Sequence, residues 1–310
     1  MEVRGIHKSE LEETINLYCL VFRPNGHARY WQYVEGDCTY QLDQTRVVVV
    51  NRRIVASLRI WERRMRIGSS IVAMGGIGGV CTHPDYRGLG YATVLMKNAI
   101  EYMRTANYDV GVLFSIIPGK FYGKLGWTPL SLEGFRIVSR RIDALKDTNW
   151  RVETFNEGRD LNQVATLYDE YNLSHSGTII RPRSYWDMAP SHLRDILPSV
   201  VARSRDTLGG YLNFQIEGKQ AKVLEVAFDR EDPTSLSALV GYLLDICNQQ
   251  QIKAICGEIP RQHPLVDLMI EGCAGDPFLT GNSSMMLYAV NLPALLRKLL
   301  PELQSRIDAS

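Results

Sequence analysis

The sequence predicts an α/β protein, of the α+β type, that consists of two similar halves. Strand patterns and helix patterns alternate along the chain. The 310 residues are long for one domain, and landmarks of the first half return in the same order in the second. The charged stretch from Asp143 to Asn149 is the expected boundary, which gives domains at residues 1–146 and 147–310.

The first part of the chain reads as a strand, a helix and a hairpin. Residues 3–6 are expected to form the strand, and Ser9 is expected to cap the helix, whose apolar residues share one face. Residues 46–51 and 55–67 are expected to form a hairpin around a polar turn, with polarity alternating from Ser57 to Glu62. Residues 70–82 continue the sheet.

In the next segment, the spacing of the apolar residues is again that of a helix. Apolar residues recur every three or four positions from Gly90 to Asn107, which predicts a helix. A buried strand at 110–117 follows, then a short helix containing Tyr122, then a last strand at 135–142. Aromatic residues cluster earlier, at Tyr30, Trp31, Tyr33 and Tyr40, where they form either the wall of a ligand site or a part of the core.

Composition excludes several function classes. Lysine and arginine total 35 against 34 acidic residues, so nonspecific binding to nucleic acid or to a membrane surface is not expected. The six cysteines form no CxxC pair and no Cys/His cluster, so neither a metal site nor a redox dithiol is indicated. A charged N-terminus and the lack of a long apolar run favour a cytoplasmic protein.

The segment from Val80 to Ala92 is the most informative part of the chain. It reads as an apolar strand that turns through a Gly-rich loop directly into a helix. Gly88 and Gly90 permit tight or positive-φ conformations, and the first N–H groups of the helix lack intrahelical partners. Because the helix dipole adds positive potential at the same end, this junction is suited to bind phosphate.

Two motifs resemble those of the GCN5-related N-acetyltransferases (GNAT). Arg87-x-x-Gly90-x-Ala92 is similar to the family's [QR]xxGx[GA] loop, and Tyr122-x-x-x-Gly126-Trp127 is similar to its later Tyr-x-x-x-Gly-[FYW] signature. The resemblance implies acetyl-CoA as co-substrate and Tyr122 as the catalytic acid; a tyrosine packed under the cofactor is the alternative. The residues that it assigns to cofactor binding are Val80, Cys81, Thr82, Arg87, Gly88, Leu89, Gly90, Tyr91 and Ala92.

Nearly the whole chain, most clearly residues 75–127, resembles the enhanced intracellular survival type, which has tandem GNAT domains, each with a mixed, mostly antiparallel sheet flanked by helices. The second half then corresponds to a degenerate domain that ends in a C-terminal helix. At its equivalent corner stands Arg230-Glu231-Asp232-Pro233, without glycine and with two carboxylates. Because a pyrophosphate needs unopposed positive potential, we expect no CoA binding there.

The function implied is direct transfer of an acetyl group from acetyl-CoA to a primary amine, without a metal. The acceptor is a small amine, an aminoglycoside-like polyamine or a peptide amine. The alternative is a non-catalytic, CoA-binding module that senses acyl groups. His83, Glu35, Asp37 and Glu62 are weaker candidates for a base or an acceptor contact. For His83 a structural or surface role is the favoured interpretation, and for the three acidic residues it is a solvated surface charge.

The sequence assigns neither the acceptor, nor the general base, nor the oligomeric state. Related proteins form rings or dimers, so a homo-oligomer is a further expectation. They also commonly carry a sterol-carrier-like domain after the segment that matches Leu292–Leu296.

Overall fold

The structure is a computed structural model that describes residues 1–115, 120–138, 149–187, 197–273 and 277–308. The chain forms two compact units, and neither is continuous in sequence. Unit 1 contains residues 1–130, 174–192 and 283–310, and unit 2 contains residues 131–173 and 193–282. The expected boundary at Asp143–Asn149 falls largely outside the described residues, so the division at 146/147 stays a prediction.

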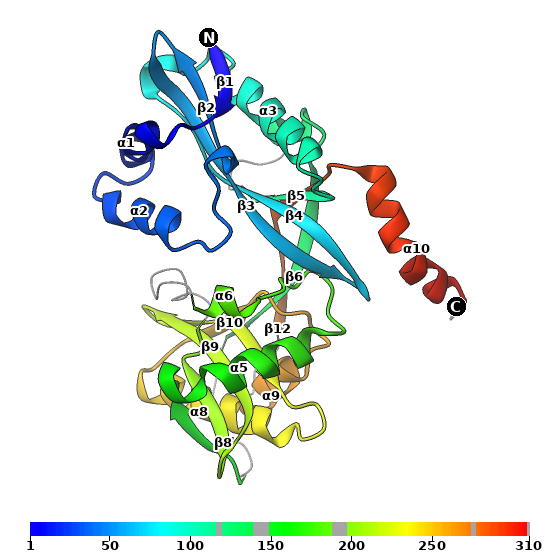
Figure 1. Ribbon diagram of the computed structural model, residues 1–310. Coiled ribbons are helices and arrows are strands. Elements are labelled where there is room, and N and C mark those ends of the chain that lie inside the picture. The colour runs from blue at the N-terminus through cyan, green and yellow to red at the C-terminus, as the bar shows by residue number, and fades with distance from the viewer. Residues whose placement is uncertain (116–119, 139–148, 188–196, 274–276, 309–310) are drawn as a thin grey trace. The chain divides into compact units, whose positions relative to one another are not determined.

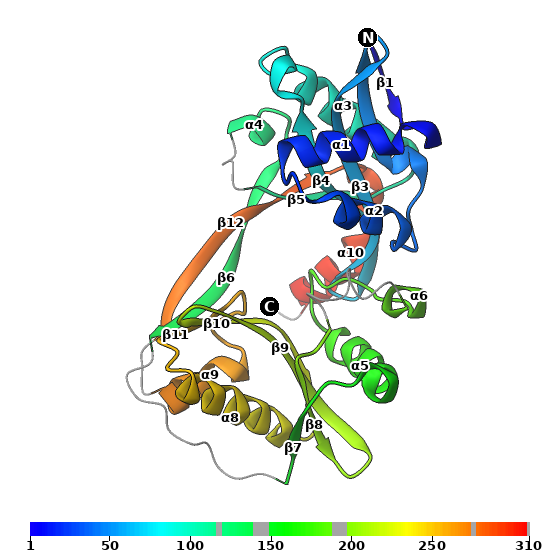
Figure 2. The same ribbon diagram turned by 90° about the vertical axis from the view of Figure 1, so that its left-hand side faces the viewer.

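Unit 1 is built on a mixed sheet. Its strands are β1 (Glu2–Gly5), β2 (Thr45–Val50), β3 (Arg53–Ile67), β4 (Ser70–Thr82), β5 (Val110–Phe114) and the C-terminal part of β12 (Pro277–Ala289). They pair in this order, antiparallel throughout except for β4 and β5, which run parallel. Figure 2 shows β5 beside β12. The C-terminal strand therefore completes the sheet of the N-terminal unit.

Helices cover both faces of this sheet. They are α1 (Leu11–Val21), α2 (His27–Glu35), α3 (Tyr91–Thr105), α4 (Lys120–Gly123), α6 (Arg183–Trp186) and α10 (Leu292–Asp308). In Figure 1, α1 and α2 lie on one face and α3 on the other. Ser9 is not the cap of α1, because a 3-10 turn at Lys8–Glu10 precedes the helix. His7 caps this turn, and Glu10 occupies the N-cap position of α1.

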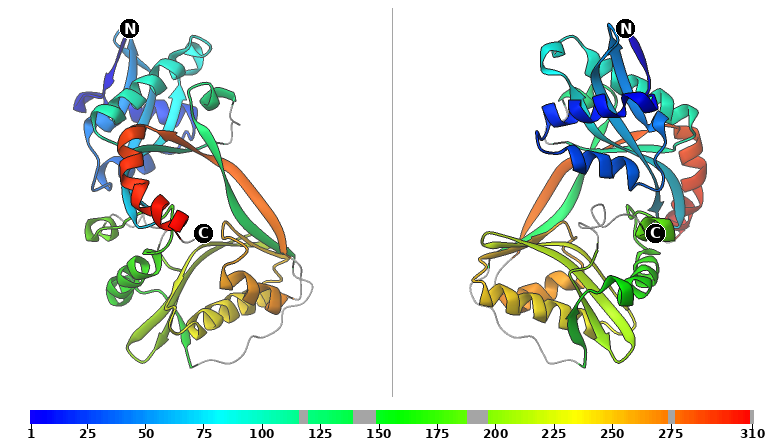
Figure 3. Two further views of the ribbon diagram at one scale, coloured as in Figure 1. Left: turned by 90° about the vertical axis from the view of Figure 1, so that its right-hand side faces the viewer. Right: turned by 60° about the vertical axis from the view of Figure 1, so that its left-hand side comes forward.

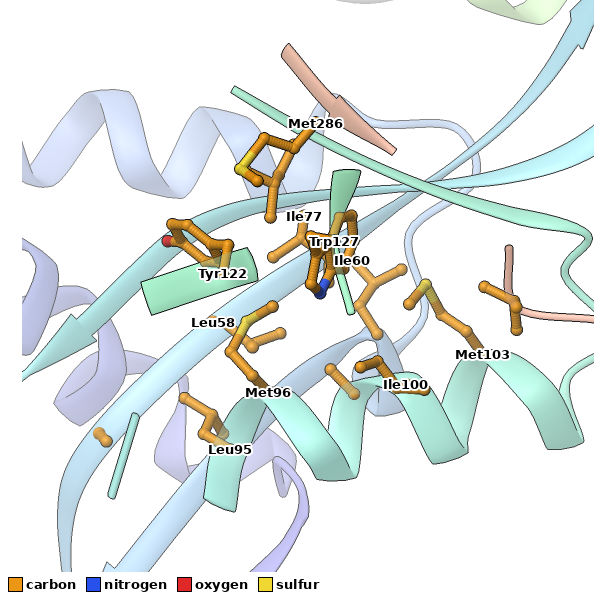
Figure 4. Close-up of a cluster of buried hydrophobic side chains, with 14 of the residues drawn as sticks. Leu58, Ile60, Ile77, Leu95, Met96, Ile100, Met103, Tyr122, Trp127 and Met286 are labelled. Atoms are coloured by element: carbon orange, nitrogen blue, oxygen red, sulfur yellow. The ribbon is translucent and has the colours of Figure 1, made fainter. Parts of the chain in front are cut away.

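The core of unit 1 lies between α3 and the sheet. Apolar residues of α3 recur at Leu95, Met96, Ala99, Ile100 and Met103, and all are buried. They pack against strand residues and against Trp127, as Figure 4 shows. Met286 of β12 joins the same cluster, so the C-terminal strand contributes apolar contacts as well as backbone pairing.

Unit 2 repeats this plan. Its strands, in order of pairing, are β6 (Thr128–Val138), β11 (Ala254–Gly257), β10 (Gln220–Phe228), β9 (Thr207–Glu217), β8 (Val200–Ser204) and β7 (Arg151–Thr154). Only β10 and β11 are parallel. Its helices are α5 (Glu157–Asn172), α8 (Thr234–Gln249) and α9 (Pro264–Cys273). Figure 3 shows α8 and α9 packed side by side.

The order β7-β8-β9-β10-β11 thus matches β1-β2-β3-β4-β5, with the parallel pair at the same place. The expected fold class is confirmed: two similar α/β units, each with a mostly antiparallel sheet flanked by helices. The strand expected at 135–142 begins earlier, at Thr128; its residues 139–142 lie outside the described part of the chain. No helix among the described residues is long and apolar enough to cross a membrane.

Candidate functional site

The turn between β4 and α3 has the backbone that an anion site needs. Gly88 and Gly90 have φ of +77° and +82°, in the left-handed region that favours glycine. A Cβ added at either position would meet no atom within 4 Å, so the space in front of the loop is empty. No side chain of the described residues caps α3, and the amides of Tyr91 and Ala92 lie in its first turn, where intrahelical acceptors are lacking.

This turn forms one wall of a cavity of about 470 Å³. Eight of the nine residues expected to bind the cofactor line it; Leu89, whose residue surface is 63% exposed, is not among them. The described lining residues are Val21, Phe22, Val80, Cys81, Thr82, Tyr86, Arg87, Gly88, Gly90, Tyr91, Ala92, Thr93 and Phe121. The fold therefore brings the predicted residues together, while their role in binding stays a prediction.

Strand β4 is irregular where it reaches this cavity. Its pairing with β3 shifts between Ser57 opposite Cys81 and Arg59 opposite Gly78, which indicates a β-bulge at Gly79, where φ is +63°. Its parallel pairing with β5 covers only Met74 to Ile77. Beyond Ile77 the two strands separate, so this edge of β4 can pair with an extended ligand.

The direction of the amides along β4 supports this geometry. His83 donates its backbone N–H to Val55 O on β3, at 2.8 Å. Because successive N–H groups of a strand alternate in direction, the Thr82 N–H points away from β3, toward the separated edge. Thr82 is thus one amide of the expected Val80–Thr82 segment that can donate to a developing oxyanion.

Tyr122 lies on α4, beside the cavity-lining Phe121. Its side chain packs in the unit 1 core, and the residue is 8% exposed. In Figure 4 its hydroxyl oxygen points away from the apolar cluster. Desolvation raises the pKa of this phenol above its ordinary value, so Tyr122 stays protonated at neutral pH. Tyr122 itself is not among the described residues that line either cavity of unit 1.

Two other residues of this region, His83 and Arg87, have structural contacts, and a third, Cys81, is buried. His83 Nδ1 accepts the Asp85 N–H, and His83 Nε2 lies 3.3 Å from a guanidinium nitrogen of Arg53. Arg87 Nε donates to Thr82 O, so its side chain braces the loop. Burial raises the pKa of the Cys81 thiol to about 12, and an un-ionised thiol is a poor nucleophile for an acyl relay.

A second cavity, of about 260 Å³, lies beneath α1 and α2 in unit 1. The described lining residues are Leu11, Thr14, Ile15, Tyr18, Phe22, Tyr30, Tyr33, Val34, Thr45, Arg59, Trp61, Gly78 and Gly79. We name this space the aromatic cavity. It shares Phe22 with the first cavity, and both are lined by β4, at Gly78–Gly79 and at Val80–Thr82 respectively.

The sequence indicates only some of these wall residues. The clustering of aromatic residues points to Tyr30 and Tyr33, but no sequence pattern marks Tyr18, Arg59 or Trp61 as lining a cavity. Arg59 and Trp61 lie two positions apart on β3, so the sequence predicts that their side chains share one face of the strand. It does not predict that this face lines a cavity.

Arg59 belongs to a buried ionic cluster that supports the aromatic cavity. Its Nη2 lies 2.7 Å from Asp37 Oδ2, and its Nη1 donates to Tyr33 O. Arg63 also donates to Asp37, and Thr39 contributes its N–H and hydroxyl. Burial raises the pKa of the Asp37 carboxyl, but Arg63 and Arg59 outweigh this effect and hold it below its ordinary value.

The acidic residues considered from the sequence lie outside both cavities. Asp37 is bound by the two arginines. Glu62 Oε2 accepts from Gln44 and Tyr108, and Glu35 is exposed at the end of α2. Among the described lining residues of either cavity there is no carboxylate, so a water chain would have to carry away the acceptor's proton.

The corner of unit 2 between β10 and α8 differs in the way expected. Asp229 Oδ1 accepts the Glu231 N–H, and Asp232 Oδ1 accepts the N–H of Thr234. The carboxylates of the chain itself thus occupy amides that an anion would need. This supports the prediction that unit 2 does not bind CoA.

Comparisons with known proteins agree with this description. Residues 2–130 match a family model described as an acetyltransferase (GNAT) domain. No curated protein sequence matches the chain. A GCN5-related N-acetyltransferase from Anabaena variabilis has a similar structure: the TM-score is 0.74 at 17% identity, over 94% of this chain and 73% of that one.

Two further structures show the same fold. Eis1 from Mycobacterium abscessus gives a TM-score of 0.67 at 15% identity, over 95% of this chain and 75% of that one. Saccharomyces cerevisiae N-myristoyltransferase, solved with bound myristoyl-CoA, gives 0.56 at 14% identity, over 93% and 82% of the two chains. At these identities the likeness establishes the fold of the chain.

Proposed function

Because residues 2–130 are an acetyltransferase (GNAT) domain, we propose that this chain transfers the acetyl group of acetyl-CoA directly to a primary amine. The observation that carries the proposal is the cavity at the corner of β4 and α3. It combines two left-handed glycines, an uncapped helix N-terminus and a separated strand edge. The empty space in front of Gly88 and Gly90 fits a diphosphate that approaches the main chain.

We assign a separate role in binding or catalysis to each group of residues at this corner. The amides of the α3 N-terminus bind the diphosphate, and the edge of β4 binds the extended arm of the co-substrate as an added strand. The Thr82 N–H stabilises the oxyanion that forms when the amine attacks the thioester carbonyl. A new C–N bond replaces the C–S bond, and the amine loses a proton to water. Tyr122 protonates the departing thiolate and then regains a proton from solvent.

The test is binding of CoA to loop variants, measured by calorimetry. We expect Gly90→Val to weaken binding at least about tenfold, because a side chain at φ +82° strains the loop and fills the phosphate space. Gly177→Val is the matched control, since Gly177 has φ of +86°, also meets nothing within 4 Å, and does not line the cavity. Wild-type affinity in Gly90→Val would contradict the assignment.

Release of free thiol from acetyl-CoA in the presence of amines distinguishes the two candidate functions. Turnover with an amine supports the enzyme. Tight binding of CoA without turnover by any amine would favour the acyl-sensing module. The cytoplasmic location, the lack of nucleic-acid and membrane partners, and assembly into a homo-oligomer stay predictions from the sequence; gel filtration with light scattering tests the last.

A further inference from the structure

We propose that the acceptor of this acetyl transfer is a small amine that carries one aromatic ring and a carboxylate, such as an aromatic α-amino acid, and is not a polycation. The inference rests on the proposed function and names the substrate class of the same site. Four features of the aromatic cavity lead to it: its position, its size, the charge of its wall and an unpartnered donor.

The position of the cavity suits an acceptor. The residues of β4 run from Gly78–Gly79 in the aromatic cavity to Val80–Thr82 in the cofactor cavity, and Phe22 lines both. An amine held in the aromatic cavity therefore lies beside the strand segment proposed to hold the thioester. The two glycines present no side chain there; Gly78 is half-buried and Gly79 is exposed, with the Trp61 and Tyr18 rings close beside them.

The size and the wall select a single ring. The volume of about 260 Å³ lies below the ~300–1,000 Å³ of pockets that hold drug-sized ligands, so a molecule of several sugar rings does not fit. Ring side chains dominate the wall, and aromatic rings favour offset or edge-to-face contact with another flat apolar ring. They are contributed by Tyr18, Phe22, Tyr30, Tyr33 and Trp61.

The charge of the wall disfavours a polycation. Arg59 is the one charged residue among the described lining residues, and its cluster combines two arginines with one aspartate. The cluster therefore carries a net positive charge, which repels an ammonium group. Cation–π contacts give little compensation. The Arg59 guanidinium lies 3.6 Å from the Trp61 ring centroid and that of Arg29 lies 5.5 Å from Tyr33, so cations of the chain already use these two rings.

Arg59 also offers a donor for an anionic group. The residue is 5% exposed, and its Nε is buried without a hydrogen-bond partner among the described residues. Because this Nε has almost no accessible surface, a ligand carboxylate reaches it only when the Arg59 side chain turns toward the cavity, and it would then satisfy this costly donor with a charge-assisted hydrogen bond. The positive field of the cluster would also lower the pKa of a nearby ammonium and so favour the neutral amine that attacks.

The experiment compares acetyl transfer to L-phenylalanine, phenethylamine and spermidine. Phenethylamine keeps the ring and the amine of phenylalanine but lacks its carboxylate. We expect kcat/KM for L-phenylalanine to exceed that for phenethylamine at least about tenfold, the contribution of one hydrogen bond to a charged group. Spermidine should be the poorest acceptor. Calorimetric titration of L-phenylalanine into the CoA-bound protein gives a second readout that does not depend on turnover.

Arg59→Lys keeps the charge of the cluster but removes the guanidinium fork. We expect this variant to lose most of the preference for L-phenylalanine over phenethylamine. Because the preference is a ratio measured in one protein sample, partial unfolding does not mimic its loss. Arg104→Lys, on the exposed face of α3, is the matched control and should keep the wild-type ratio. Tyr33→Leu should raise the KM for L-phenylalanine without changing the affinity for CoA.

The possible results distinguish the acceptor inference from the proposed acetyltransferase function. Faster transfer to spermidine than to L-phenylalanine would overturn the acceptor inference and leave the acetyltransferase proposal intact. The same holds if CoA binds but L-phenylalanine neither binds nor reacts. Failure to bind CoA would instead overturn the proposed function.

Discussion

Replacement of Asp37 by asparagine tests the ionic cluster on which the shape of the aromatic cavity depends. The Asp37 side chain is 0% exposed and accepts from Arg59, Arg63 and Thr39. Asparagine keeps the shape but removes the charge, so two arginines would face each other without a counter-ion. Loss of one partner from a buried pair commonly costs about 3–5 kcal/mol, a large part of the ~5–15 kcal/mol stability of a typical protein.

The assay is urea denaturation of Asp37→Asn and of Asp187→Asn. Asp187 also pairs with an arginine, Arg183, at 2.9 Å, but both side chains are more than half exposed, at 53% and 59%. Surface pairs contribute about 0–1 kcal/mol, so the control should lose little stability. Equal losses in the two variants would refute the reasoning that burial makes the Asp37 cluster structurally important.

The same cluster predicts a pH dependence. The pKa of the folded-state Asp37 carboxyl is lowered, so its stabilisation is complete above the unfolded-state pKa of about 3.9 and disappears as the pH falls through the folded-state value. The difference in unfolding free energy between wild type and Asp37→Asn should therefore be constant near pH 7 and decrease below about pH 4. A difference that grows toward acid pH would contradict this sign.

Two further predictions concern the reaction. Tyr122→Phe should lower kcat by about 10²-fold or more while CoA affinity, measured by calorimetry, stays unchanged; a wild-type kcat would assign Tyr122 to packing alone. Cys81→Ala should keep acetyl transfer, because burial raises the pKa of this thiol to about 12. In the native wild type, iodoacetamide should modify the exposed Cys38 well before Cys81, and peptide mapping would reveal the opposite order.

The sequence predicted the local elements of unit 1 well because their signals are local. The spacing of apolar residues in α3 and the glycines of the preceding loop depend on neighbours a few residues apart. The cavity at the β4–α3 corner could be anticipated for the same reason, since one continuous segment, 80–92, supplies most of its wall. The repeat was visible in the order of landmarks, and the matching strand orders of the two units confirm it.

Tertiary structure alone decided which distant segments meet. Nothing in Met285–Ala289 indicates that this strand pairs with β5. The sequence of a strand shows how polar and apolar residues alternate, but it does not show which other strand lies beside it. The aromatic cavity was hidden for a related reason: its wall combines α1, α2, β3 and β4. The structural role of the Arg59 charge depends on its burial beside Asp37, which the sequence does not show. The sequence thus determined the fold class and the β4–α3 corner that we propose to bind the diphosphate, whereas long-range packing determined the sheet partners and the composition of the aromatic cavity.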